Sequence, residues 1–166
     1  MTLQPVPILT VTLDNADATL GFGQKIGQVL VSGDTLALIG PLGVGKTQLA
    51  RGLAAGLEVP SEYHLTSPTF TLMAQFPCRE GVFRHLDLYR LQDETALWEM
   101  GFFDVLQSPG VMAVEWWDRF MDTWRPDTLA LRLSGGIDDG NMRRLEIWTL
   151  SFGDWQRRVA RIRSIM

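Results

Sequence analysis

Hydrophobic and polar positions recur with regular spacings along the chain, and these spacings predict an early run of strands and helices. Residues 6–13 alternate as a strand does, and an Asp-Asn pair then offers an N-cap for an amphipathic helix at 16–31. Residues 35–39 form a short apolar run that ends in glycine, the pattern of a buried strand, and 47–57 has helical spacing of its leucines. The first third of the chain therefore predicts strand, helix, strand, helix.

The later part of the chain predicts two hairpins, two helices and one more buried strand. In chain order these are strands at 70–76 and 82–88 joined by 77–81, a helix at 93–100, a strand at 110–115, strands at 128–133 and 143–150 across a Gly/Asp-rich turn, and a helix at 154–163. Helices and hairpins in this order predict an α/β fold of three layers, with a central sheet that mixes parallel and antiparallel strands. No repeat or linker interrupts the pattern, so we expect residues 1–166 to form a single domain.

Composition and charge narrow the class of protein. Hydrophobic residues make up 46% and charged residues 20%, as in an ordinary globular domain, and no apolar stretch is long enough to span a bilayer. The first residues show no secretion signal, and the single cysteine, Cys78, fits a reducing compartment, so we expect a cytoplasmic protein. The net charge of −4 argues against a broad electrostatic attraction to nucleic acid or to membrane.

Residues 40–47 carry the most specific chemical signal. They read Gly-Pro-Leu-Gly-Val-Gly-Lys-Thr, a full match to the P-loop pattern G-x-x-x-x-G-K-[ST], and they lie between a predicted strand and a predicted helix. The glycines let successive backbone N–H groups point at phosphate oxygens, and the helix N-terminus adds positive potential. We therefore expect a nucleoside triphosphate here, with Lys46 at the β- and γ-phosphates and the Thr47 hydroxyl on Mg²⁺.

The sequence also indicates which nucleotide is expected and which residues contact it. ATP is favoured over GTP, because the guanine-reading Asn-Lys-x-Asp pattern is absent from the sequence. Lysine is rare in this chain, with two lysines against thirteen arginines, which fits a need for a compact charge on a flexible stem at the phosphates. The expected nucleotide contacts of the loop are Gly40, Leu42, Gly43, Val44, Gly45, Lys46, Thr47 and Gln48.

Two acidic residues end predicted strands, where a P-loop enzyme holds its metal ion. An apolar run at 111–115 ends in Glu115, and a more polar one at 82–87 ends in Asp87. A carboxylate in such a place binds Mg²⁺ directly or through water, and another group often orients the attacking water. Without the P-loop each acid would be interpreted as an ordinary surface residue.

Ser67-Pro68-Thr69 and His85 each have a structural and a functional interpretation. The first is either a simple turn or a switch segment that presents a hydroxyl to the γ-phosphate or its metal. His85 shares a strand face with Asp87, and its functional interpretation is a metal ligand; because no second histidine or cysteine is nearby, the structural interpretation as a hydrogen-bonding residue is favoured.

The aromatic and basic features near the end of the chain are also open to two interpretations. Trp116 and Trp117 are expected to point to opposite faces of a strand end, in core packing or on a partner surface. The four arginines of the helix at 154–163 form either a solvated face or a docking patch for RNA or an acidic protein.

The order and spacing of these motifs resemble the TsaE (YjeE) family, the small bacterial P-loop ATPases of tRNA threonylcarbamoyladenosine synthesis. The segments that carry the resemblance are residues 19–23, 40–47, 67–72, 85–91, 100–101 and 114–116. Ser-Pro-Thr-Phe-Thr-Leu and His-Leu-Asp-Leu-Tyr-Arg-Leu are far more specific than the P-loop.

The resemblance implies a P-loop NTPase-like mixed-sheet fold and a weak, Mg²⁺-dependent ATPase. It also implies that the protein works with the TsaB and TsaD proteins, of which TsaD transfers threonylcarbamoyl to the tRNA adenosine. The roles that it implies for single residues are catalytic or switch functions for Lys46, Asp87 and Thr69, Mg²⁺ binding for Thr47 and Glu115, and nucleotide contacts for Ala16 and Arg143.

Three functions are compatible with these features. The leading hypothesis is an ATPase whose nucleotide state changes its affinity for partner proteins, with tRNA contacted only through the complex. A small-molecule kinase shares the loop but needs arginine-bearing lids over an acceptor, and the sequence offers none that can be assigned. The third hypothesis is an interaction module that binds ATP without hydrolysing it.

Overall fold

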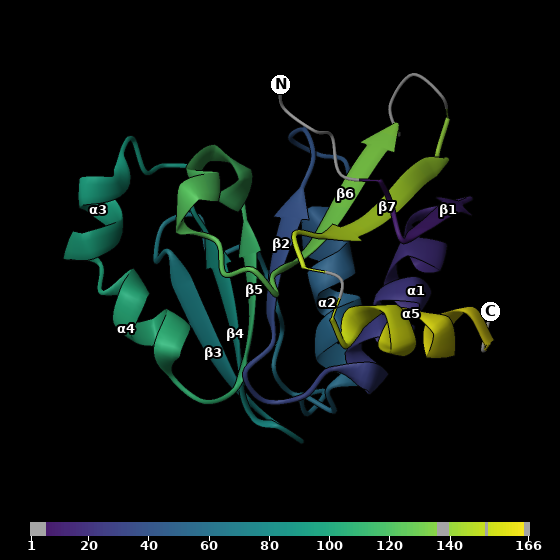
Figure 1. Ribbon diagram of the computed structural model, residues 1–166, viewed down its shortest axis with the longest axis horizontal. Coiled ribbons are helices and arrows are strands. Elements are labelled where there is room, and N and C mark those ends of the chain that lie inside the picture. The colour runs from purple at the N-terminus through teal and green to yellow at the C-terminus, as the bar shows by residue number, and fades with distance from the viewer. Residues whose placement is uncertain (1–5, 136–139, 152, 165–166) are drawn as a thin grey trace.

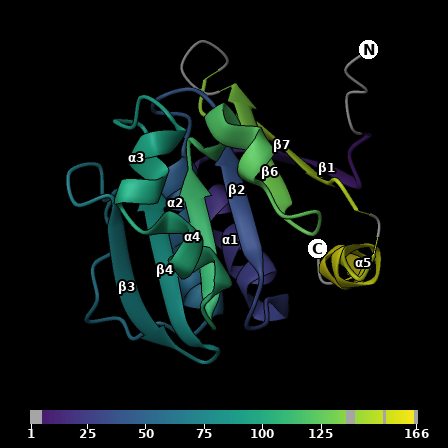
Figure 2. The same cartoon turned by 60° about the vertical axis from the view of Figure 1, so that its left-hand side comes forward.

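The computed structural model describes residues 6–135, 140–151 and 153–164, which form a seven-stranded sheet with helices on both faces (Figures 1 and 2). The sheet has the order β1-β7-β6-β2-β5-β4-β3, in which β6, β2, β5 and β4 pair in parallel and the outer pairs are antiparallel. The strands are β1 (Leu9–Leu13), β2 (Thr35–Ile39), β3 (Met73–Cys78), β4 (Gly81–Asp87), β5 (Val111–Glu115), β6 (Leu129–Gly135) and β7 (Arg143–Thr149). The expected three-layer α/β fold with a mixed sheet is confirmed.

The helices divide between the two faces of the sheet. They are α1 (Ala16–Val29), α2 (Lys46–Gly56), α3 (Glu94–Glu99), α4 (Phe102–Gln107), the 3-10 helix η1 (Trp117–Thr123) and α5 (Trp155–Ser164). One core lies under α1, α2 and α5, and the other under α3, α4 and η1 (Figure 1). In the central strand β2, Leu36 and Leu38 face the first core while Ala37 and Ile39 face the second, so the strand is apolar throughout because both its faces are covered.

The first two helices pack against each other through glycines. Asn15 caps α1 as expected, since its Oδ1 accepts a hydrogen bond of 2.8 Å from the Ala18 N–H. A Cβ at Gly52 of α2 would lie 2.2 Å from the Leu20 carbonyl oxygen of α1, so only glycine permits this approach. The short distance between the helices fixes α2, whose N-terminus carries the end of the P-loop.

One strand begins later than predicted, and two of the helices were not predicted. The strand expected at 70–76 begins at Met73, because the Leu72 N–H closes a turn onto the Pro68 carbonyl at 2.7 Å with Leu72 at φ 65. The helices α4 and η1 are six and seven residues long, and the sequence pattern did not predict them. The expected strand alternation at Trp116 and Trp117 is wrong, because Trp116 at φ 64 ends β5 and Trp117 is buried in η1. Part of the Gly/Asp-rich turn expected between β6 and β7 lies outside the described residues.

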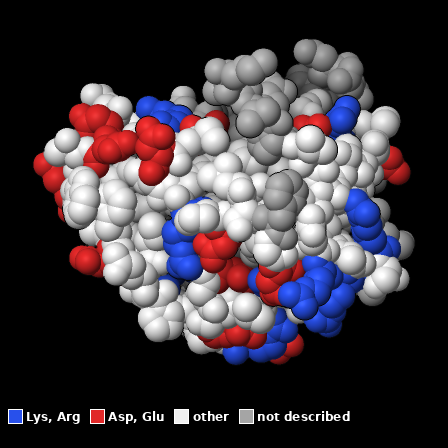
Figure 3. Space-filling model, in the orientation of Figure 1, with Lys and Arg blue, Asp and Glu red and all other residues white. Residues whose placement is uncertain are grey.

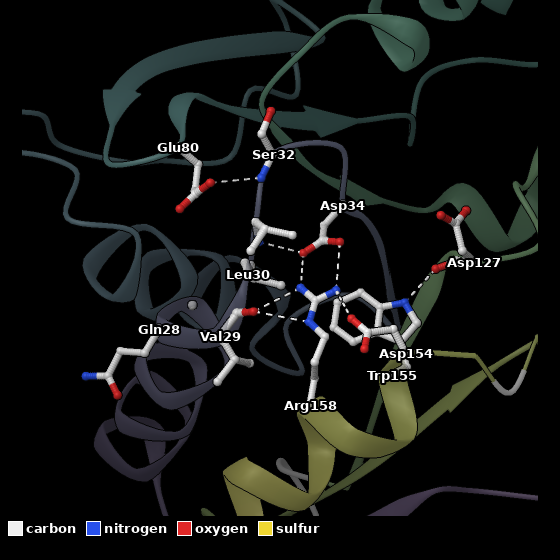
Figure 4. A network of polar contacts seen from close by, with 12 residues as sticks. Gln28, Val29, Leu30, Ser32, Asp34, Glu80, Asp127, Asp154, Trp155 and Arg158 are labelled. Carbon is white, nitrogen blue, oxygen red and sulfur yellow. Dashed lines mark hydrogen bonds and ion pairs between the residues drawn. The ribbon is translucent and has the colours of Figure 1, made fainter.

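The C-terminal helix is attached by one of its arginines (Figure 4). The Arg158 guanidinium donates to both carboxylate oxygens of Asp34 and to the Val29 carbonyl, and it stacks 3.9 Å from the centre of the Trp155 ring. Trp155 itself donates to the Asp127 carbonyl at 2.7 Å. Arg158 therefore serves as an internal tether and is not part of the solvated basic face that the sequence pattern indicated.

Charge is distributed unevenly over the surface. On the face shown in Figure 3, acidic side chains gather over α3 and basic side chains gather over α5. Among the described residues, no helix is both long enough and apolar enough to cross a membrane.

Candidate functional site

The P-loop connects the end of β2 to the start of α2, at the carboxyl edge of the parallel strands. Gly40, Gly43 and Gly45 adopt φ values of 149, 78 and 117, which L side chains rarely tolerate. A Cβ at Gly40 would also lie 2.5 Å from the Leu133 carbonyl oxygen of β6. The loop conformation therefore needs these glycines, and α2 begins directly at Lys46 behind them.

Lys46 is almost completely buried, and its amine turns back onto the loop. Its Nζ donates to the Gly40 carbonyl at 2.6 Å and to the Pro41 carbonyl at 2.9 Å, and it lies 4.1 Å from the centre of the Trp116 ring. Burial lowers the pKa of Lys46, while the carboxylates of Glu115, Asp118 and Asp87 act in the opposite direction. The hydrogen-bond acceptors of the ammonium group in the loop are both neutral carbonyls, and a negatively charged phosphate group can compete with them.

Thr47 and Glu115 meet across the gap between α2 and β5. The Thr47 hydroxyl donates to Oε1 of Glu115 at 3.0 Å, and His85 Nε2 lies 2.8 Å from the same oxygen. Glu115 and His85 are both buried, at 3% and 0% exposure. The structure thus brings together the two expected metal-binding residues, and it confirms the interpretation of His85 as a hydrogen-bonding residue.

Asp87 holds the segment that follows α2. Its Oδ2 accepts hydrogen bonds from Ser67 Oγ at 2.5 Å and from Thr69 Oγ1 at 3.0 Å, and its Oδ1 accepts one from the Tyr89 N–H at 2.9 Å. The two hydroxyls also lie 3.2 Å apart. The Ser-Pro-Thr segment is therefore both a turn and a part of the site, because its side chains are fixed on a strand-end carboxylate.

These groups surround one cavity of about 310 Å³. Its lining consists of Leu42, Gly43, Gly45, Lys46, Thr47, Ser67, Thr69, Asp87, Tyr89, Glu115 and Trp116. The described residues contain no group of three or more His, Cys, Asp or Glu side chains that could hold a metal ion alone. A hydroxyl and a carboxylate 3.0 Å apart nevertheless fit Mg²⁺, which binds to one or two carboxylates and takes its other ligands from phosphates and water.

The other predicted nucleotide contacts lie around the loop and outside this lining. Gln48 Nε2 donates to the Ala16 carbonyl at 3.3 Å, which connects α2 to the start of α1. Arg143 Nε donates to the Val44 carbonyl at 2.6 Å and so connects β7 to the loop. The Val44 side chain is buried in the core, and therefore only its backbone is available to a ligand.

Two aromatic residues of the cavity received no site role from the residue patterns alone. The Tyr89 and Trp116 rings lie 5.0 Å apart, and the Arg119 side chain fixes the Tyr89 backbone by a 2.8 Å hydrogen bond to its carbonyl. Tyr89 lies two residues after Asp87, and Trp116 directly follows Glu115, so their nearness to the acids was the available signal. Trp116 packs against the core under α3, α4 and η1, as one of its two interpretations expected, and its ring also covers Lys46 in the cavity wall.

Comparisons with known proteins place the chain among relatives of one kind. The family profile described as "Threonylcarbamoyl adenosine biosynthesis protein TsaE" matches residues 13–144. A Nostoc protein named "tRNA threonylcarbamoyladenosine biosynthesis protein TsaE" is 35% identical over 138 residues, which cover 81% of this chain and 82% of the relative. A protein of the same name from Aquifex aeolicus is 32% identical over 140 residues, which cover 83% and 94%.

A solved structure shares the fold. It is described as "Crystal structure of Bacillus subtilus YdiB", and it superposes with a TM-score of 0.76 at 21% sequence identity, covering 95% of each chain. At this identity the likeness concerns the fold alone.

Proposed function

Because the chain belongs to the TsaE family, we propose that it is an ATP-binding, weakly ATP-hydrolysing, Mg²⁺-dependent subunit that supports threonylcarbamoyl transfer to tRNA adenosine. It would act in the cytoplasm with the TsaB and TsaD proteins and contact tRNA through that complex. The observation that carries the proposal is that the P-loop, the Thr47–Glu115 pair and the Asp87 cluster line the same cavity.

The loop residues would bind the triphosphate. The backbone N–H groups of 40–47 and the Lys46 ammonium supply positive potential, and Lys46 exchanges its two loop carbonyls for phosphate oxygens. Thr47 and Glu115 would hold Mg²⁺, which supplies charge neutralisation at the phosphates when it is bound. Ala16 accepts a hydrogen bond from Gln48 and Arg143 donates one to Val44, and these two residues would contact the rest of the nucleotide.

Asp87 is the group best placed to act on an attacking water. Its carboxylate lines the cavity beside Lys46, and its orientation is fixed by the Ser67 and Thr69 hydroxyls. A carboxylate in this position can accept a hydrogen bond from water and orient it toward a bound phosphate. Movement of the hydroxyl pair would also transmit the nucleotide state to residues 67–72, and this would change the affinity for partners.

The test is ATP turnover by the full chain, measured alone, with TsaB and TsaD, and with tRNA added. Partner-dependent turnover should fall at least about 100-fold in Asp87→Asn and Glu115→Gln, with nucleotide binding partly retained. The matched control is Asp122→Asn, because Asp122 is an exposed acid outside the cavity. Unchanged turnover in both cavity variants would contradict the catalytic assignment, and stoichiometric phosphorylation of an added small-molecule acceptor would favour a kinase.

A further inference from the structure

His85 is a fully buried polar residue that the proposed chemistry does not use. On β4 it pairs in register with Ala113 of β5, which places it diagonally next to Glu115. Its Nε2 lies 2.8 Å from Oε1 of Glu115, inside the core layer that also holds α2. A polar side chain at this depth is costly to bury unless it is hydrogen-bonded, and the bond to Glu115 offsets part of this cost.

The hydrogen bond to Glu115 determines which nitrogen of His85 is the donor. An ionised carboxylate only accepts hydrogen bonds, so Nε2 must be the donor to Glu115. His85 Nδ1 is buried and has no hydrogen-bond partner among the described residues, so the contact with Glu115 is the one that orients the ring. His85 therefore acts on Glu115 through its Nε2–H.

Oε1 of Glu115 receives hydrogen bonds from both His85 and Thr47. A glutamate has three side-chain torsions, and the neighbouring Asp87, its register partner on β4, repels it rather than holding it. In the described part of the chain, the hydrogen bonds that restrain the Glu115 carboxylate come from these two side chains. The Thr47 hydroxyl can rotate, whereas the imidazole ring is held rigidly in the core, so the lasting restraint on Glu115 comes from His85.

We propose that His85 is a positioning residue for the divalent cation: its Nε2–H holds the Glu115 carboxylate beside the Thr47 hydroxyl so that both oxygens bind the same ion. The inference rests on the proposed function, since it assumes that Thr47 and Glu115 bind Mg²⁺. Hydrogen-bonding partners that orient a metal ligand typically change metal affinity by about 10- to 100-fold when they are removed. A residue that only fills space in the core would not show this effect on the metal alone.

The experiment compares two amides at position 85. In His85→Gln the side-chain amide nitrogen lies near the place of Nε2, and in His85→Asn it lies near that of Nδ1. The full chain is saturated with a non-hydrolysable ATP analogue, and the Mg²⁺ concentration for half-maximal stabilisation is read from the melting temperature. The matched control is His64→Gln, because His64 is exposed and is the other histidine of the sequence.

We expect the half-saturating Mg²⁺ concentration to rise about 10- to 100-fold in His85→Asn and to stay near the wild-type value in His85→Gln and His64→Gln. Analogue affinity measured in EDTA should be the same in all four proteins. An unchanged Mg²⁺ requirement in His85→Asn would overturn the inference, as would an equal loss of affinity in EDTA. Wild-type protein without any Mg²⁺ dependence would instead contradict the proposed function.

A measurement on the wild-type protein does not depend on whether a variant folds. The ¹⁵N signals of the His85 ring should show a proton on Nε2, both without Mg²⁺ and with the Mg²⁺-analogue complex. An Nε2 atom without a proton in either state would overturn the inference, because Nε2 could not then donate to Glu115.

Discussion

Asp87 and Glu115 are register partners at the carboxyl ends of the neighbouring parallel strands β4 and β5, and both are 3% exposed. Two buried carboxylates side by side repel each other unless positive charge or hydrogen bonds compensate. Here the two carboxylates accept hydrogen bonds from different donors. Glu115 accepts one from Thr47 of α2, while Asp87 accepts from Ser67 and Thr69. Under the proposed function, this separation would leave Glu115 to bind the metal ion and Asp87 to act on water, although the two come from equivalent positions of adjacent strands.

The contact between Ser67 and Asp87 should contribute to stability as well as to activity. Ser67→Ala removes a hydrogen bond to a charged acceptor, and we expect the free energy of unfolding to fall by about 1.5 to 3 kcal/mol. In an Asp87→Asn background the same change should cost at least about 1 kcal/mol less, because the charged partner is already absent. Denaturant unfolding of the four proteins measures this coupling, with the exposed Ser61→Ala as control; additive losses would show that the contact carries no energy of its own.

Lys46 should contribute to nucleotide affinity through its charge. Its amine reaches two loop carbonyls and the Trp116 ring, so Lys46→Ala deletes the one ammonium that lines the described cavity. We expect ATP affinity to fall about 10- to 100-fold, the magnitude of one hydrogen-bonded charge interaction. Titration calorimetry of Lys46→Ala beside Lys25→Ala checks this, since Lys25 is the other lysine of the chain and lies on α1 away from the loop. Equal affinities in the two variants would contradict the role given to Lys46.

The P-loop could be predicted from sequence because its geometry is local. The positive φ values of the glycines and the start of α2 depend on consecutive residues, and so the motif and its flanking elements were found within a residue or two. The apolar runs of β2 and β5 were equally clear, since strands covered on both faces carry apolar side chains at each position.

The side-chain contacts around the cavity could not be predicted because they join residues that are far apart in the sequence. The His85–Glu115 hydrogen bond joins residues 30 apart, and it depends on the pairing of β4 with β5. The Ser67–Asp87 contact depends on the turn at Leu72, whose positive φ is unusual for leucine and leaves no sequence signal. Short helices such as α4 give too few turns for a periodic pattern to appear.

Cys78 gives a pH-dependent signal from the β3–β4 hairpin. Burial raises the pKa of its thiol above the ordinary value of 9.0. The folded state thus favours the neutral thiol, and this stabilisation is present below pH 9 and is lost as the pH rises through the native pKa, because the unfolded chain ionises first. The rate at which the Cys78 thiol is alkylated rises with pH, and the midpoint of this rise should therefore lie at a higher pH in native than in denatured protein. A native midpoint at or below the denatured one would contradict the effect of burial.

The packing of α1 on α2 can be tested with one substitution made in two places. Gly52→Ala puts a methyl group 2.2 Å from the Leu20 carbonyl oxygen, so the helices must separate, and we expect a loss of about 1 to 3 kcal/mol in the free energy of unfolding. Gly21→Ala makes the same change on α1 where no atom lies within 4 Å, and the better helix propensity of alanine should add up to about 1 kcal/mol. Opposite signs in thermal or denaturant unfolding are therefore expected. Two variants of equal stability would contradict the proposed packing constraint. Since α2 carries Thr47, a displaced helix in Gly52→Ala should also raise the half-saturating Mg²⁺ concentration.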